Sequence, residues 1–385
     1  MRELPPGPRE PTALQTLEWV LRPTALLRRA QARHGEPFTL RTAWSDAPLV
    51  LTSDPAEIKR IYAAPPDVLR GGDSSAFLEP FVGPHSLLIL HGEPHRRQRR
   101  LMMPPFHGEA LPRWTATIAE IARAEVATWE PGVELRVLPR MQALTLEVIQ
   151  RVIFGSRDPE LRDALRRALD MSASFPDLVA MSLFGPHRRF ASAVRRIDEL
   201  IYARIDQAGA DGSILDLLAQ SGATREELRD QLVTLLAAGH ETTATALAWA
   251  CERLARHPTP LDTDERIDAF VKHTLRTRPV LTITARRTLR PYELQGYTLP
   301  EGVYVAACIY LAHRRAEGPF TYLPFGGGNR RCIGAAFAAL ELREVLRAIA
   351  ARFTLRPDRP EGERMRRRGV TLAPARGGRI VPVTR

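Results

Sequence analysis

The chain has 385 residues, 44% of them hydrophobic, which predicts one globular domain spanning residues 1–385 and excludes a disordered chain. Its formal net charge is +11, and almost all of the positive charge comes from arginine. Basic clusters lie at 96–100 and 364–368, but no helix-turn-helix, zinc-finger or aromatic stacking motif accompanies them. We therefore expect no nucleic-acid binding. The apolar runs are far shorter than the roughly 20 residues that span a bilayer, and the proline-rich N-terminus lacks the apolar segment of a secretory signal, which predicts a cytoplasmic protein without a membrane anchor.

Hydrophobic periodicity predicts a mainly helical protein with a small β region. Apolar residues recur at three- and four-residue spacing in the segments Ile118–Trp129, Leu144–Ile153, Phe190–Ile205, Leu228–Ala255 and Ala335–Phe353. Strand character is found in Phe38–Arg41 and Leu49–Thr52, which we expect to form a hairpin, and in Tyr297–Ala306. We therefore expect a β-rich lobe at roughly 35–65 plus 280–310 and a helical lobe made of the remainder.

The longest predicted helix begins after Thr224 and ends near His257. Thr224 and Glu227 have the spacing of a capping box, in which each side chain binds a backbone N–H of the first turn, and Pro258 cannot continue the helix. At 1.5 Å per residue this helix is roughly 50 Å long, which is the span of a whole domain. We expect it to cross the centre of the protein.

The middle of this helix carries Ala-Ala-Gly-His-Glu-Thr-Thr at residues 237–243. A glycine, a carboxylate and two threonines are poor choices for a buried helix, because they lower helix propensity or need hydrogen-bond partners. Gly239 would let a flat ligand approach the backbone, and Thr242 can bind an upstream carbonyl and loosen the helix. The segment predicts a kinked groove with a proton-bearing pair, although a Glu241 on a solvated face would explain the same residues.

The three cysteines, Cys251, Cys308 and Cys332, are far apart and lack CxxC spacing, which excludes a disulfide framework and a structural zinc site. Cys332 lies in the glycine-rich stretch Phe325–Gly334, just before a predicted helix, where backbone N–H groups favour the thiolate form that ligates iron. A phosphate-binding loop is the alternative. It fits less well, because the Gly-Lys-Ser/Thr ending is missing and Tyr-Leu-Pro is a poor buried strand.

These two motifs, in this order, resemble those of the cytochromes P-450. The stretch Phe325–Gly334 matches the FxxGxRxCxG haem loop of that family, and residues 239–243 resemble its oxygen-activating helix motif. The resemblance covers nearly the whole chain and looks closest to soluble bacterial members. It implies the cytochrome P-450 fold, mainly α with a small β region, and one haem b as cofactor.

The resemblance implies roles for residues around the haem. Cys332 would be the axial ligand, with Phe325 shielding its sulfur and Gly334 leaving room beside it. Glu241 and Thr242 would be the acid and the alcohol that guide protons to bound dioxygen, and Thr243 is a weaker candidate. The other residues expected at the cofactor are Gly239, which would border the haem, and the propionate partners His95, Arg99, Arg286 and Arg330, with Arg287 as a competitor of Arg286.

The implied activity is that of a haem-thiolate monooxygenase that hydroxylates a hydrophobic small molecule with O2. Electrons would come from a ferredoxin or flavodoxin with its NAD(P)H-dependent reductase, and we expect a monomer. Two alternatives remain, which are a degenerate, non-catalytic haem-binding or sensor protein and a haem peroxygenase or isomerase. The residues expected to contact substrate are Phe77, Leu87, Leu88, Ala238, Val280, Leu281 and Ile283.

The sequence departs from the family at two kinds of position. Family members carry Glu-x-x-Arg in a helix where this chain has His273 and Arg276, so the expected ion pair is replaced by at most one hydrogen bond between these two residues. The segments 257–266 and 313–322 are also shorter than expected. These departures favour a weakened support for the haem rather than a changed chemistry.

Overall fold

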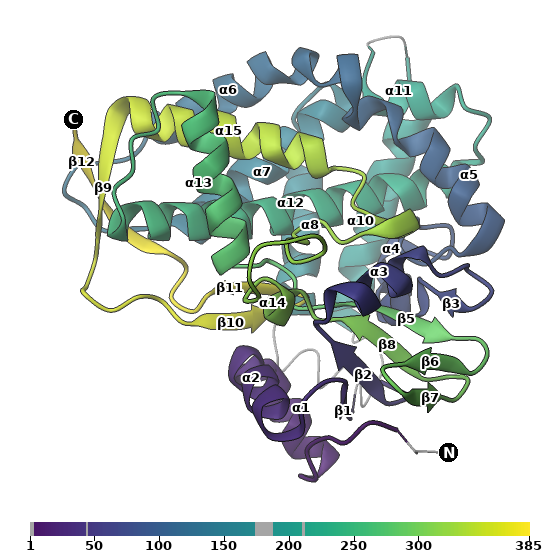
Figure 1. Ribbon diagram of the computed structural model, residues 1–385. Coiled ribbons are helices and arrows are strands. Elements are labelled where there is room, and N and C mark those ends of the chain that lie inside the picture. The colour runs from purple at the N-terminus through teal and green to yellow at the C-terminus, as the bar shows by residue number, and fades with distance from the viewer. Residues whose placement is uncertain (1–3, 44, 174–187, 210–211) are drawn as a thin grey trace.

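The computed structural model describes residues 4–43, 45–173, 188–209 and 212–385, and Figure 1 shows helices stacked around one long central helix, with the larger sheet to one side. The α-helices are α1 (Thr12–Leu21), α2 (Pro23–His34), α3 (Pro55–Ala63), α4 (Glu79–Val82), α5 (Gly92–Met102), α6 (Pro112–Ala127), α7 (Val137–Phe154), α8 (Pro159–Ala173), α10 (Arg188–Asp206), α11 (Ile214–Ala219), α12 (Arg225–Arg256), α13 (Asp264–Thr277), α14 (Ile309–Ala312) and α15 (Ala335–Arg352). Short 3-10 helices occur at η1 (Asp73–Leu78), η2 (Pro104–Phe106), η3 (Gly108–Ala110) and η4 (Gly328–Arg330).

The central helix is α12, as the sequence predicts. The capping box is present, since the Thr224 hydroxyl accepts from the Glu227 N–H at 3.2 Å and the Glu227 carboxylate accepts from the Thr224 N–H at 2.9 Å. The helix ends at Arg256, before Pro258. It packs against α7, α13 and α15 in the largest hydrophobic cluster, and most of its residues are buried on either side of the partly exposed turn 237–242. Any polar side chain that it carries in its buried parts must therefore find its partners inside the protein.

The larger sheet has the strand order β1-β2-β8-β5-β3. The predicted hairpin of β1 (Phe38–Leu40) and β2 (Leu49–Thr52) is confirmed, with Phe38 opposite Leu51. The central strands are β8 (Tyr304–Ala307), parallel to β2, and β5 (Thr284–Thr288), antiparallel to β8, and the edge strand is β3 (Leu69–Arg70). The sheet thus joins residues that are far apart in the chain. It places β5 next to α3 and η4.

The remaining strands form small antiparallel sheets. The pairs are β6 (Tyr292–Leu294) with β7 (Tyr297–Leu299) and β10 (Met365–Arg368) with β11 (Thr371–Pro374), and the order β4-β12-β9 joins β4 (Leu135–Arg136), β12 (Arg379–Thr384) and β9 (Phe353–Pro357). The expectation of one extended segment over Tyr297–Ala306 is wrong, because a turn at 300–303 separates β7 from β8 and sends them to different sheets. Within the described ranges no helix is long and apolar enough to cross a membrane.

Candidate active site

The glycine-rich loop holds Cys332 at its end, directly before α15. The Cys332 N–H donates to the carbonyl of Phe325 at 3.0 Å, which closes the loop. Gly326 and Gly328 have φ of +66° and +65°, a conformation that favours glycine. A Cβ on Gly328 would lie 2.2 Å from the carbonyl oxygen of Tyr62, so the loop needs glycine to pack closely on α3. Of the three free cysteines only Cys332 is exposed.

The thiol of Cys332 is subject to opposing influences. Although the residue reaches solvent, the surrounding protein desolvates the thiol and raises its pKa, while a hydrogen bond from the Gly334 backbone and the charges of Arg99 and Arg331 lower it, and the net direction is upward. The backbone donor thus acts as the sequence predicts, but desolvation outweighs it. A metal ion that binds the sulfur would supply the missing charge, since coordination deprotonates a thiol outright.

Four basic side chains gather beside this loop: His95 and Arg99 one turn apart on α5, Arg286 on β5, and Arg330 on η4. Burial, then the charges of Arg330, Arg99 and Arg286, lowers the pKa of His95 to about 3. Burial, Arg286 and Arg99 lower the pKa of Arg330 to about 10. None of the four forms an ion pair with a carboxylate in the part of the chain that the structure describes.

Arg330 and Arg286 are fixed by backbone contacts. Arg330 donates to the carbonyls of Leu87 at 3.1 Å, Gly71 at 2.8 Å and Leu90. A Cβ on Gly71 would lie 3.0 Å from Nε of Arg330 and 3.3 Å from Cδ of Arg286, so both arginines pack over this glycine. Such crowding of unpaired cations is costly unless an anion lies among them, so the cluster fits a ligand with carboxylate groups.

The structure distinguishes Arg286 from its neighbour in sequence. Successive side chains on a strand point to opposite faces. Arg286 is 8% exposed and faces the cluster, whereas Arg287 binds Asp46 at 2.9 Å on the other side of β5. Arg287 is therefore not positioned to join the other three groups.

Glu241 lies in a polar network that the sequence does not reveal. Its carboxylate accepts from Gln142 on α7 at 2.6 Å and from Nε of Arg368 on β10 at 3.0 Å. Arg368 also binds Asp170 on α8 at 2.6 Å. Burial raises the pKa of Glu241, while Arg368 and Gln142 lower it. The alternative of a Glu241 on a solvated face is thus excluded, because its side chain is only 15% exposed and held from two sides.

Thr242 points elsewhere than Glu241. Its hydroxyl donates to the carbonyl of Ala238 at 2.7 Å, which matches the predicted bond to an upstream carbonyl, but α12 stays helical through this turn and no kinked groove results. The two side chains share no hydrogen bond in the described structure, because successive residues on a helix point about 100° apart. The exposed residues of this turn are Ala238 and, in part, Thr242, while Thr243 is buried.

Gly239 has a packing reason that the sequence does not show. A Cβ there would lie 3.3 Å from Cδ1 of Ile149 on α7, so the glycine lets the two helices approach closely. Gly334 differs, since nothing lies within 4 Å of a Cβ built on it. The space next to Cys332 is thus open, as expected, whereas the missing side chain of Gly239 faces α7.

The residues expected to contact substrate do not all come together. Leu87 is buried in the largest hydrophobic cluster, and Val280 packs against the same cluster. Leu281 and Ile283 pack instead against two other clusters, one around α3 and one around α1 and α2. The expected contact of Val280, Leu281 and Ile283 with substrate stays a prediction. Phe77 on η1 is 61% exposed, Leu88 is half-buried and Ala238 is exposed.

Arg276 has partners other than His273. His273 is exposed on α13, whereas Arg276 donates to the carbonyl of His313 at 3.2 Å and lies 3.6 Å from the carboxylate of Glu317. Burial lowers the pKa of His313 to about 4, so its ring is neutral at pH 7. That ring bonds to the carbonyl of Arg276 and accepts from the Leu323 N–H at 2.8 Å. The expected hydrogen bond between His273 and Arg276 is absent from the described structure.

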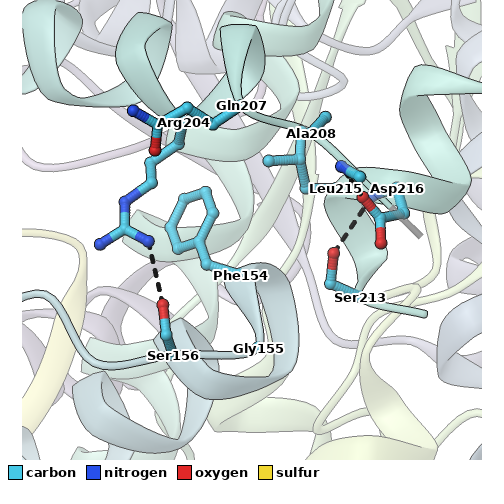
Figure 2. A pocket seen from close by; sticks show the side chains of 10 residues that line it. Phe154, Gly155, Ser156, Arg204, Gln207, Ala208, Ser213, Leu215 and Asp216 are labelled. Atoms are coloured by element: carbon cyan, nitrogen blue, oxygen red, sulfur yellow. Dashed lines mark hydrogen bonds between the residues drawn. The ribbon is translucent and has the colours of Figure 1, made fainter. Parts of the chain in front are cut away.

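A separate hollow of about 190 Å³ lies where α7 and α10 end and α11 begins (Figure 2). Arg204 binds Ser156 at 2.9 Å and Asp158 at 3.0 Å, and Asp216 accepts from backbone N–H groups of Gly209 and Gly212. Its charged groups therefore have partners of their own. The hollow contains none of the residues that the two motifs predict, so it is not the candidate site.

Comparisons with known proteins agree with the motifs. The sequence model described as Cytochrome P450 matches residues 5–262, 266–318 and 316–379. Cytochrome P450 135B1 of Mycobacterium tuberculosis is 38% identical over 429 aligned positions, covering 98% of this chain and 91% of the relative.

The match to the family model is interrupted at 263–265 and restarts at 316–318, which are the two places where the sequence is shorter than expected. The 429 aligned positions exceed the 385 residues of the chain, so the relative contains residues that this chain lacks.

Solved structures show the same fold. The retinoic-acid-bound cyanobacterial CYP120A1 superimposes with a TM-score of 0.83 at 21% identity, covering 100% of both chains. CYP175A1 from Thermus thermophilus superimposes with a TM-score of 0.78 at 26% identity, covering 96% of this chain and 97% of the other.

Proposed function

The chain belongs to the cytochrome P450 family, whose members are haem-thiolate monooxygenases with haem b as cofactor, and we propose that it hydroxylates a hydrophobic small molecule with O2 and electrons from a separate redox protein. The observation that carries this proposal is the convergence of Cys332 with four basic groups that have no carboxylate partner of their own in the described structure. Asp73, whose charge acts on Arg330, is itself paired with Arg70 at 2.7 Å.

The residues present fit a haem. Its propionates are carboxylates, and His95, Arg99, Arg286 and Arg330 would hold them through charge-assisted hydrogen bonds. Cys332 would bind the iron, and the open space beside Gly334 leaves room next to the sulfur. When bound, the haem supplies the activation of dioxygen.

The protein's own contribution is to hold and position a proton on α12. Glu241 keeps a proton more readily than an exposed carboxyl because burial raises its pKa, and Arg368 and Gln142 fix its position. Asp170, which is 52% exposed, connects this network to solvent through Arg368. Thr242 holds its hydroxyl on the exposed side of α12, one residue further on. We propose that a proton reaches the Thr242 hydroxyl from Glu241 through water or after Glu241 leaves Arg368, since their present directions forbid direct contact.

The test is spectroscopic and then catalytic. A reduced, CO-bound difference spectrum with the red-shifted Soret band of this family would support thiolate ligation by Cys332, and Cys332→Ser should abolish it. Turnover with a ferredoxin or flavodoxin and its reductase should then give a product that contains one oxygen atom from O2, detected with ¹⁸O2. Haem-loaded protein without the shifted band would refute the thiolate assignment. Normal spectra without product from any hydrophobic substrate panel would favour the haem-binding or sensor alternative.

A further inference from the structure

A second hollow, of about 550 Å³, opens between the end of α12 and the helix α13. Its lining includes Phe270 and Pro260, and around them lie the basic side chains of Arg253, His257, Arg266 and His273. We call this site the α12–α13 hollow. Phe270 is only 7% exposed and belongs to the main hydrophobic cluster, so the apolar lining is anchored in the core. A volume of this size lies within the range of about 300–1,000 Å³ that small-molecule sites occupy.

Three of the four basic side chains of the α12–α13 hollow lack partners. In the described part of the chain, the side chains of Arg253, His257 and His273 have no hydrogen bond or ion pair. Arg266 is neutralised by Asp262, whose two carboxylate oxygens lie 2.7 Å from its Nη1. The pKa of His257 is lowered, first by Arg253 and then by burial, against an opposing influence of Glu252, so its ring is neutral at pH 7. Arg253 is therefore an unpaired cation at the edge of an apolar surface, with imidazole N–H groups beside it that can donate hydrogen bonds, and this combination favours an anion.

Two of the chain's three departures from its family lie at this hollow, whereas the short segment 313–322 is not part of its lining. The family-model match is interrupted at 263–265, at the start of α13 and directly before Arg266, which lines the hollow. His273 stands where the family carries glutamate, so one side of the hollow has exchanged a carboxylate for an imidazole. The substitution leaves no carboxylate at position 273 to repel an anion. Thr259 and Pro260 of the shortened connection line the same hollow as His273.

We propose that the α12–α13 hollow binds an amphipathic organic monoanion, a carboxylate or sulfonate on a small apolar body. The anionic group lies among Arg253, His257 and His273, and the apolar body covers Phe270 and Pro260. A bare inorganic anion would leave the apolar surface uncovered, and a neutral apolar molecule would leave the Arg253 guanidinium unpaired. This site is separate from the cysteine loop and does not depend on the proposed monooxygenase activity.

The test uses the haem-loaded protein in its reduced, CO-bound form, which is diamagnetic and therefore suited to NMR. Histidines are labelled with ¹³C, and the ring signals of His257 and His273 are assigned from His257→Gln and His273→Gln. Naphthalene-1-sulfonate is then added as the probe, with the neutral naphthalene-1-sulfonamide as its uncharged counterpart. We expect both assigned signals to shift with one saturation curve, while the signals of the other eight of the ten histidines stay in place.

Variants of the protein show whether the probe binds through its charge or only through apolar contact. Arg253→Gln should weaken binding of the sulfonate about two- to fivefold, because one half-exposed charge is removed. The control is Arg28→Gln, at an exposed arginine on α2, which should leave the affinity for the sulfonate unchanged. Equal binding of the sulfonamide, or equal affinity of Arg253→Gln, would overturn the proposed anion site. The absence of a saturable shift at His257 and His273 would overturn binding at this hollow altogether.

Discussion

Replacement of Arg368 by glutamine tests the network that holds Glu241. The bond from Arg368 to Glu241 is 3.0 Å long and reaches a carboxylate that is 15% exposed, so its loss should cost about 1.5–3 kcal/mol. The bond to Asp170 reaches a 52% exposed carboxylate and adds at most about 1 kcal/mol. The sum is about 1.5–4 kcal/mol. At about 2.1 cal/mol/K per residue the unfolding entropy of 385 residues is about 0.8 kcal/mol/K, so Tm should fall by about 2–5 °C at neutral pH.

The loss in stability should depend on pH with a defined sign. The folded-state pKa of Glu241 is raised by burial, so its contribution to the free energy of unfolding is fully present below the unfolded pKa of about 4.3 and is lost as pH rises through the folded pKa. In Arg368→Gln the folded-state pKa of Glu241 rises further. The free energy of unfolding that is lost with rising pH is then larger, and it continues to be lost up to a higher pH. The difference between wild type and Arg368→Gln should therefore be small near pH 4 and grow toward pH 8.

The assay is thermal unfolding of the haem-loaded protein between pH 4 and 8, followed by circular dichroism. Arg225→Gln serves as control because its pair with Asp206 is exposed on both sides, and we expect no change in Tm. In the Glu241→Gln background, Arg368→Gln should cost less and should no longer depend on pH. A pH-independent loss in Tm, or the same loss in the Glu241→Gln background, would refute the assigned interaction.

Four further changes test other parts of the protein. Arg330→Gln should lower haem occupancy, measured as the ratio of Soret to protein absorbance, while Arg287→Gln should not; equal losses would contradict the propionate assignment. Thr242→Ala should lower product formed per NAD(P)H consumed, and unaltered coupling would count against its role in proton delivery. Glu341 is fully buried and its Oε1 lacks a hydrogen-bond partner in the described structure, and burial raises its pKa well above 4.5. Glu341→Gln should therefore raise Tm by an amount that grows as pH rises from 5 to 9, with little effect at pH 4. A change in Tm that is the same at every pH would refute this. His273→Glu should raise Tm or haem content by offering a carboxylate to Nε of Arg276, which lacks a hydrogen bond in the described structure, and an unchanged Tm and haem content would refute it.

The long helices were predictable because their signals are local. The capping box at Thr224 and the proline at 258 define α12 almost to the residue, and Ala335 begins α15 as expected. By contrast, α5 is dominated by charged residues and shows little apolar periodicity, although it carries His95 and Arg99. Only the resemblance to the family indicated these two residues. A helix whose role is to present charges to a cofactor does not show the apolar stripe from which helices are predicted.

The network around Glu241 could not be predicted, because its members come from four separate elements. Gln142 on α7, Asp170 on α8 and Arg368 on β10 show no feature in sequence that relates them to α12. Glu241 and Thr242 are adjacent in sequence and were therefore predicted to act as a pair, but the helix directs their two side chains about 100° apart. The same limit applies to Gly239, since its nearest neighbour, Ile149, is 90 residues away in the chain.

The loss of the Glu-x-x-Arg ion pair does not leave this region without polar contacts. His313 is 4% exposed and neutral, and it joins the carbonyl of Arg276 to the Leu323 N–H, two residues before the cysteine loop begins. A neutral ring that donates on one side and accepts on the other avoids the cost of burying an unpaired charge, which is the main penalty of a broken internal ion pair. Arg276 in turn donates to the His313 carbonyl and faces the ring of Tyr322 at 5.6 Å. These contacts tie α13 to the segment that precedes Phe325, so the cysteine loop keeps a structural connection to α13 without the ion pair.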